Sequence, residues 1–481
     1  MKLPRMCLAV TAIVSLGVCS AADPPPGGKL RATREFSAST DWVLAKEQAS
    51  PSSFIYQAMA YDSSRGRTVL FGGWHSGHLG ETWEWDGIVW TQKAPAKSPP
   101  NRRLHAMAYD SARGRVVLFG GYDGSSYLRD TWEWDGTTWT QKAPVTSPPP
   151  RTEFAMAYDS ARGRTVLFGG EDQGLLSDTW EWDGTAWAQK LPATSPPARY
   201  MHAMVFDSAR GRVVLFGGSG FSGYLGDTWE WDGTAWTQKT PATSPPARYY
   251  HAMGYDSARG HVVLFGGYAG DYVNDTWEWD GTVWARKLPA TSPPVRDSHA
   301  MAYESARGRV VLFGGYDGSS YLGDTWEWDG TTWTQTTPAT RPSAREAHAM
   351  AYDSARGRVV LFGGWAAALL GDTWEYTHGV VVFTKVQHPR VTWQSDPRYT
   401  SYNLYRGSLA ALRAGGPYTQ APGSNPYAAQ FCGLTVPYQD DPLVPATGEA
   451  FYWLVAGSSI DGEEPLGDGD TVTRPNDNPC P

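Results

Sequence analysis

Residues 105–121 read HAMAYDSARGRVVLFGG, and near-copies of this stretch recur through most of the 481-residue chain. Each copy carries one methionine, and successive methionines are separated by 48 or 49 residues. A period of this length is typical of proteins that stack one supersecondary unit many times. The seven methionines are Met59, Met107, Met156, Met204, Met253, Met301 and Met350.

Each repeat contains four short segments with strand character. In the second repeat, residues 105–109 alternate large and small side chains, as a strand with two different faces does. Residues 116–119 are all apolar, which predicts a strand buried on both faces, and residues 131–134 and 139–142 supply two more. Asp, Ser and Gly residues suited to tight turns separate the segments. Seven such units predict an all-β fold, a seven-bladed β-propeller of four-stranded antiparallel blades.

The first and last repeats complement each other. In six repeats a fourth-strand tryptophan lies 17 residues before the next methionine, whereas the seventh repeat loses the pattern after Tyr376. Trp42 lies 17 residues before Met59 and therefore occupies the register of the missing strand. We expect residues 40–47 to complete the seventh blade and close the ring, which removes open sheet edges. The propeller is predicted to span residues 40–378.

The repeat resembles the kelch repeat. The matching features are the paired glycines after the second strand, the aromatic pair Trp134 and Trp139, and the Arg102-x-x-His105 motif before the first strand. The resemblance is strongest to secreted bacterial kelch-like proteins and to the galactose oxidase central domain. Galactose oxidase builds its cofactor from a Cys–Tyr crosslink, and the repeats contain no cysteine, so that activity and that cofactor are not expected.

The N-terminus predicts export. Two basic residues precede an apolar stretch at 6–18 that is too short to span a bilayer, and small residues follow at 20–22. We expect a signal peptide at 1–22, a linker at 23–39 and a secreted, periplasmic or cell-surface protein. Lipid attachment at Cys19, giving an outer-membrane-anchored form, is the alternative. No later segment is long and apolar enough to cross a membrane.

Residues 379–481 differ in composition from the repeats and predict a small β-sandwich. Trp393, the Tyr-x-Leu-Tyr run at 402–405 and later strand-like segments resemble a fibronectin type III domain. Cys432 and Cys480 are the two cysteines left outside the predicted signal peptide, and in an oxidising compartment we expect them to form one disulfide.

Composition and motifs argue against several functions. A net charge of −8 without basic clusters makes a nucleic-acid partner unexpected. No G-x-S-x-G or HExxH motif is present, so we expect no catalysis; a hydrolase or lyase using a carboxylate pair on polysaccharide is the alternative. Five histidines recur at the start of the first strand, but equivalent positions around a ring lie too far apart for one metal ion, so no metal is expected. They are His105, His202, His251, His299 and His348.

In an antiparallel blade, the second-to-third-strand loop and the blade-to-blade crossover emerge on one face, here called the loop face. The DSARGR and Asp-Gly turns emerge on the other, here called the turn face, and are nearly unchanged between repeats. We expect the turn-face arginines to pair with the acids of these two turns. The loop face carries almost all the variation in side chain and length.

The loop-face sequences combine aromatic rings with Asp, Ser and Gly, a composition that suits sugar or peptide binding. Tolerant loops without function are the alternative interpretation. The sequence therefore predicts a monomeric, non-catalytic binding module for a protein or glycan. The candidate ligand-binding residues are Trp74, His75, Tyr122, Asp123, Tyr127, Glu171, Asp172, Phe221, Tyr224, Tyr268, Asp271, Tyr272, Tyr316, Asp317, Tyr321 and Trp365.

Overall fold

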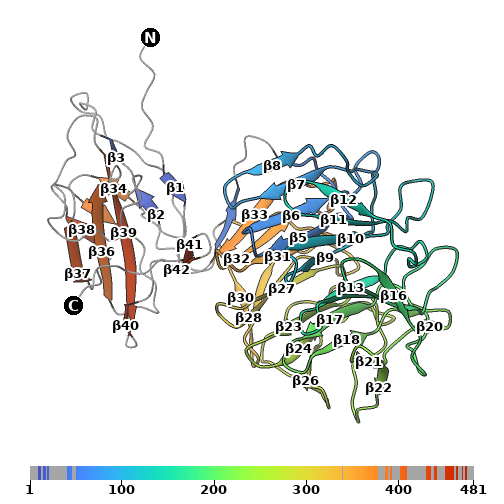
Figure 1. The fold of residues 1–481 in the computed structure, drawn as a ribbon. Helices are drawn as coiled ribbons and strands as arrows, with labels where there is room; N and C mark the ends of the chain where they lie inside the picture. Colours follow the sequence, from blue (N-terminus) through green and yellow to red (C-terminus); the bar gives the residue numbers. More distant parts are fainter. Residues whose placement is uncertain are drawn as a thin grey trace. The chain divides into compact units, whose positions relative to one another are not determined.

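The structure, a computed structural model, describes residues 50–338 and 340–377, the segment 41–45, and the backbone of short strands elsewhere. The chain divides into two compact units (Figure 1). The propeller unit comprises Val43–Thr337 and Arg341–Tyr376, and the second unit comprises Met1–Trp42, Pro338–Thr340 and Thr377–Pro481.

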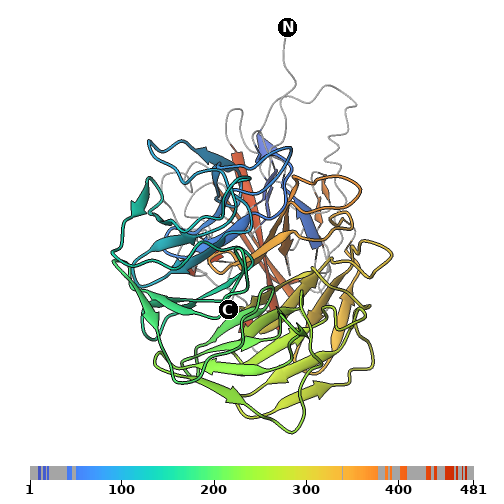
Figure 2. The ribbon, with the colours of Figure 1, turned by 90° about the vertical axis from the view of Figure 1, so that its right-hand side faces the viewer.

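The propeller unit confirms the predicted fold: seven four-stranded antiparallel sheets follow one another around a ring (Figure 2). In the second blade the strands are β9 (Ala106–Asp110), β10 (Arg115–Phe119), β11 (Thr131–Trp134) and β12 (Trp139–Lys142), paired in that order. Alternate residues of β10 pack against the first and the third blade, so neighbouring blades cover both of its faces.

Five further blades repeat this order. The first blade contains β5 (Ala58–Asp62), β6 (Arg67–Phe71), β7 (Thr82–Trp85) and β8 (Trp90–Lys93), and the third contains β13 (Ala155–Asp159), β14 (Arg164–Phe168), β15 (Thr179–Trp182) and β16 (Trp187–Lys190). The fourth contains β17 (Ala203–Asp207), β18 (Arg212–Phe216), β21 (Thr228–Trp231) and β22 (Trp236–Lys239), with the loop hairpin β19 (Ser219–Gly220) and β20 (Gly223–Tyr224). The fifth contains β23 (Ala252–Asp256), β24 (His261–Phe265), β25 (Thr276–Trp279) and β26 (Trp284–Lys287), and the sixth contains β27 (Ala300–Glu304), β28 (Arg309–Phe313), β29 (Thr325–Trp328) and β30 (Trp333–Thr336).

The seventh blade draws its strands from both ends of the propeller sequence. It contains β31 (Ala349–Asp353), β32 (Arg358–Phe362) and β33 (Thr373–Thr377), with β4 (Asp41–Leu44) in the outermost position. Directly after β4, the Ala45 backbone N–H donates to the Thr373 carbonyl at 3.0 Å. The outer edge of β33 is therefore paired rather than left open.

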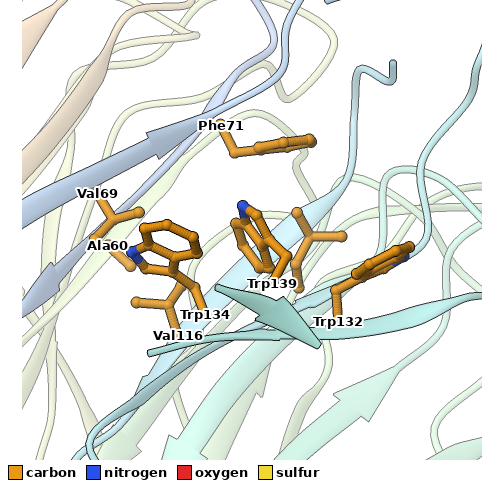
Figure 3. Packing of buried hydrophobic residues seen from close by; sticks show 8 residues of the cluster. Ala60, Val69, Phe71, Val116, Trp132, Trp134 and Trp139 are labelled. Carbon is orange, nitrogen blue, oxygen red and sulfur yellow. The ribbon is translucent and has the colours of Figure 1, made fainter. Parts of the chain in front are cut away.

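Aromatic and aliphatic side chains fill the space between blades. Figure 3 shows one such cluster, in which Phe71 of the first blade meets Trp139 of the second, with ring centroids 5.4 Å apart at 68°. Trp134 packs beside Trp139 at 5.4 Å. Edge-to-face aromatic pairs of this kind stabilise beyond their buried area.

A closed ring of polar contacts joins all seven blades. In each blade the second aromatic residue of the third strand donates a hydrogen bond to a buried glutamate on the third strand of the preceding blade. The donor–acceptor pairs are Trp85–Glu375, Trp134–Glu84, Trp182–Glu133, Trp231–Glu181, Trp279–Glu230, Trp328–Glu278 and Tyr376–Glu327, at 2.7–2.8 Å.

Six of these seven glutamates, rather than the Asp-Gly turns, form ion pairs with the first arginine of the DSARGR turn in their own blade. Arg113 contacts Asp110 of its own turn and the β11 residue Glu133 at 2.5 Å. Asp135 of the Asp-Gly turn accepts backbone N–H groups of its own turn. The predicted pairing was therefore half wrong. Turn-closing hydrogen bonds already occupy the Asp-Gly carboxylates; among the described residues Arg309–Asp329 is the one ion pair to an Asp-Gly turn, whereas the pairs with the acids of the first turns form as predicted.

The second unit contains two larger sheets. One joins β34 (Lys385–Gln387), β35 (Arg390–Thr392) and β38 (Tyr438–Asp440); the other joins β3 (Cys19–Ser20), β39 (Ala450–Ser459), β36 (Ser401–Ser408) and β37 (Ala429–Leu434), with β40 (Gly462–Glu463) on β39. Two hairpins pair β1 (Ala9–Thr11) with β2 (Ser15–Gly17), and β41 (Asp468–Gly469) with β42 (Val472–Thr473).

The predictions for this unit remain predictions. Cys432 lies on β37, whereas Cys480 lies outside the described residues. The signal peptide, the fibronectin-like sandwich and the disulfide are therefore untested. No helix in the described part of the chain is long and apolar enough to cross a membrane.

Candidate functional site

The loop face is built from two segments of each blade held together by a backbone bridge. The crossover residue Arg103 and the loop residue Tyr122 exchange N–H···O bonds of 3.0 and 2.9 Å. The paired glycines permit this approach: Gly121 has φ of 101°, and a Cβ there would lie 2.8 Å from the Arg103 carbonyl oxygen. The kelch-like Gly-Gly therefore positions the loop against the crossover.

The residue after each bridged crossover residue adopts a left-handed backbone conformation, with φ of 52–59°. These residues bond from blade to blade: the Leu104 N–H donates to the Tyr56 carbonyl at 3.1 Å, and that of Met201 to the Glu153 carbonyl at 3.0 Å. The first strands of neighbouring blades contact one another all around the propeller, which places them nearest its axis, and these residues closely precede the first strands, so this axial ring surrounds the axis. Its members are Tyr56, Leu104, Glu153, Met201, Tyr250, Ser298 and Ala347.

Sequence reasoning missed the axial ring, although a signal was present. Its residues lie three positions before each repeat methionine and differ in nearly every repeat, inside a stretch that is otherwise almost copied. Positive φ is unfavourable for residues other than glycine, so the surrounding hydrogen bonds must impose it. The axial ring therefore holds a different side chain from nearly every blade at equivalent positions around the propeller axis.

The larger cavity on the loop face, of about 520 Å³, lies between the second and third blades. It brings together four predicted residues, Tyr122, Tyr127, Glu171 and Asp172, with Glu153 of the axial ring. The rings of Tyr122 and Tyr127 are 5.3 Å apart. The remaining lining residues are Arg103, Leu104, Ser125, Ser126, Pro150, Thr152 and Gln173.

The smaller cavity, of about 300 Å³, lies between the seventh and first blades. Tyr56, Glu346, Trp74 and Trp365 line it together with Arg103, which therefore borders both cavities. The Arg103 guanidinium lies 5.8 Å from the centre of the Tyr122 ring, within range of a cation–π contact.

Three loop-face carboxyl groups have pKa values above their usual range. Burial, and then the charge of Glu171, raise the pKa of Glu153 to about 7, although Arg103 opposes this. Burial raises the pKa of Asp297 to about 6; this side chain is only 8% exposed. Burial and the charge of Asp297 also raise the pKa of Glu346. The loop face thus holds desolvated carboxyl groups with little compensating positive charge.

Eight aromatic side chains form a continuous arc across the loop face of the fourth to seventh blades. Successive ring centroids are 4.9–5.8 Å apart from Tyr250 through to Tyr321, and the Trp365 indole N–H donates to the Tyr321 hydroxyl at 3.0 Å. We call this set the aromatic arc: Tyr224, Tyr249, Tyr250, Tyr268, Tyr272, Tyr316, Tyr321 and Trp365.

The remaining predicted residues do not join these features equally. Asp123 and Asp317 accept backbone N–H groups within their own loops, which lowers the pKa of both and gives them a turn-forming role. Asp271 likewise bonds the backbone of its neighbour Tyr272. Phe221 is 79% exposed at the tip of the β19–β20 hairpin, and His75 bonds the Ser53 carbonyl at 2.7 Å.

The repeated histidines lie between blades. The His105 ring packs edge-on against Phe71 of the preceding blade, with centroids 5.6 Å apart at 83°, and the other four histidines do the same. Within the described residues no group of three metal-ligating side chains occurs. The contacts are those of packing residues.

This burial predicts acid sensitivity. Burial, helped by the charge of Arg102, lowers the pKa of His105 to about 3, and the other four histidines are shifted in the same direction. Below pH 6.5 the unfolded chain binds protons that the folded chain does not, so the free energy of unfolding should fall as pH drops from 6.5 towards 3. Urea unfolding at several pH values measures this slope.

His105→Gln supplies the matched control. Gln57 occupies the same position in the first blade, where its side-chain N–H donates to the Phe362 carbonyl at 3.2 Å. The variant should fold and show a shallower dependence of unfolding free energy on pH. An unchanged slope would contradict the assignment of this acid sensitivity to the histidines.

Comparison with known proteins agrees with the repeat pattern over part of the chain. Residues 234–399 match the family model of the KLHDC2/KLHL20/DRC7 Kelch-repeats domain. No curated protein matches the chain. The match begins in the fourth blade and covers the later blades, in which most of the aromatic arc lies.

Proposed function

We propose that this chain is an exported, monomeric, non-catalytic binding module that takes a protein or glycan ligand on its loop face. The observation that carries the proposal is the aromatic arc, which lies on the same face as two cavities. Strands and turn-face loops are near-copies in all seven blades, whereas the side chains of this face differ from blade to blade. Tyr and Trp supply large contact areas at low entropic cost, as ligand-binding surfaces require.

The Kelch-repeat match supports the same function, because Kelch propellers typically mediate protein interactions. The export part of the proposal rests on the N-terminal sequence at 1–22, with lipid attachment at Cys19 as its variant. Residues 379–481 we propose as a fibronectin-like spacer.

The double substitution Tyr127→Ala plus Tyr321→Ala tests the proposal. It removes one ring beside the larger cavity and one ring of the aromatic arc. Binding found in a screen of glycans and proteins should weaken about 30-fold or more, because two truncated aromatic anchors at about 1 kcal/mol or more each cost about 2 kcal/mol or more together. Titration by surface plasmon resonance measures the change.

Ile88→Ala is the control, since Ile88 is 65% exposed on the turn face. It should leave binding unchanged. Equal affinity of the Tyr127/Tyr321 variant and the unmodified protein would contradict the proposed binding face.

The alternative, a hydrolase or lyase acting on polysaccharide, has one observation in its favour. Glu153, with its pKa raised to about 7, shares the larger cavity with Glu171 and Asp172, and a carboxyl group protonated near neutral pH can act as a general acid. Release of products from a polysaccharide panel, abolished by Glu153→Gln, would replace the binding proposal with this one.

A further inference from the structure

We propose that the ligand of the loop face is a basic polypeptide segment whose lysine or arginine side chains lie on the aromatic arc. The inference rests on the proposed function and names the chemistry of its ligand.

The rings of the arc stand against one another instead of lying flat. The interplanar angles are 87° for Tyr224–Tyr268, 82° for Tyr268–Tyr272 and 79° for Tyr272–Tyr316, and the other four ring pairs are inclined by 41–60°. In such an arrangement the edge of one ring covers part of the face of the next, so no broad coplanar surface forms for a row of sugar rings. Single ring faces remain usable by compact cationic groups, which bind within about 6 Å of a ring centre.

Negative charge follows the arc. Asp297 is bridged to Tyr316 and Glu346 to Trp365 through the backbone, and Asp271 directly precedes Tyr272. The second-to-third-strand loops of these four blades contain no lysine or arginine. A polypeptide with positive side chains complements this surface, whereas an acidic one would be repelled.

Three of the four arginines in the adjoining crossovers cannot neutralise this charge. Arg248, Arg296 and Arg345 are fully buried, and each forms a two-pronged ion pair with an aspartate of its own blade: Asp275, Asp324 and Asp372. Arg341 is the one other arginine of these crossovers, and it is exposed. Glu346 shares the smaller cavity with Arg103, yet burial and the charge of Asp297 still raise its pKa, so negative charge outweighs positive charge at this carboxyl group and a bound cation would relieve it.

Fluorescence anisotropy with three synthetic probes tests the inference on the full-length protein. The probes are a 12-residue peptide of alternating lysine and small residues, the same peptide with glutamate for lysine, and a labelled oligosaccharide of similar length. We expect saturable binding of the lysine peptide, weakened by salt, and no binding of the glutamate peptide. Tyr272→Ala plus Tyr316→Ala should weaken lysine-peptide binding about tenfold, and Glu346→Gln severalfold.

Matched variants separate binding from folding. Tyr272→Phe plus Tyr316→Phe keeps both rings and should keep most of the affinity, while Ile88→Ala on the turn face should keep all of it. Lysine-peptide binding that is insensitive to the arc variants would overturn the inference, because it would reflect net charge alone. Oligosaccharide binding lost in the Tyr272/Tyr316 alanine variant would also overturn it, yet would leave the proposed binding function intact. Failure of every ligand in the wider screen would instead reject the proposed function.

Discussion

Replacing Trp182 with alanine should lower the free energy of unfolding by about 3–5 kcal/mol, the usual cost of removing a large buried aromatic side chain. Trp182 is fully buried between the second and third blades, where it packs against Trp187 with ring centroids 5.5 Å apart. Its indole N–H donates to Glu133 of the preceding blade at 2.8 Å. The substitution therefore removes both packing and one link of the closed polar ring.

The seventh blade supplies the matched variant for this experiment. It has Tyr376 where the other blades have tryptophan, and the Tyr376 hydroxyl donates to Glu327 at 2.7 Å. Trp182→Tyr should therefore be tolerated better than Trp182→Phe, which fills similar space but cannot donate. The difference should be about 1.5–3 kcal/mol, typical of a hydrogen bond to a charged group.

Guanidinium unfolding, followed by circular dichroism, measures these losses. Equal stability of the tyrosine and phenylalanine variants would show that the polar ring contributes nothing beyond packing. A loss near zero for Trp182→Ala would contradict the blade interface itself.

Asp178→Asn should cost about 3–5 kcal/mol, because it leaves a buried arginine without its counter-charge. Arg151 is fully buried, and its guanidinium forms two hydrogen bonds of 2.7 Å to the Asp178 carboxylate. It also donates to the carbonyls of Gly169 and Pro149. Burial alone would raise the pKa of Asp178, but Arg151 outweighs it and holds that pKa below its usual range.

The double variant Arg151→Met plus Asp178→Asn tests whether the cost arises from the orphaned charge. It should lose less stability than the sum of the two single variants, since contacting charges are coupled by roughly 0.5–3 kcal/mol. The first blade shows that a blade can form without the pair, because Phe54 stands where the others have this arginine. Strict additivity in urea unfolding would contradict the orphaned-charge explanation.

The blades were predictable because their signals are local and repeated. Four segments with turn residues between them define one blade, and seven copies multiply every signal. The pairing of the turn-face arginines was predicted only in part. Asp110 is close to Arg113 in sequence, whereas Glu133 lies on β11 and reaches Arg113 only because the blade twists and packs.

The candidate site was predictable as a face but not as a set of residues. Loop variation identified Tyr122, Tyr127 and Glu171, which do line the larger cavity. Arg103 and Glu153 were not predicted, because the crossover sequence has the composition of a simple connection between blades. The left-handed backbone conformation in the crossover depends on hydrogen bonds from neighbouring blades. These residues come together in one cavity only when the blades close into the propeller.

The sequence by itself determined the all-β class, the number of blades and the face on which variation gathers. The periodicity of the sequence carries this information, because it can be recognised without knowing which side chains are in contact. Only the tertiary structure decided that Tyr224 to Trp365 form one aromatic arc and that Glu153 and Asp297 are desolvated. Contacts between blades and exclusion of water arise from residues about 50 positions apart, which no local pattern encodes.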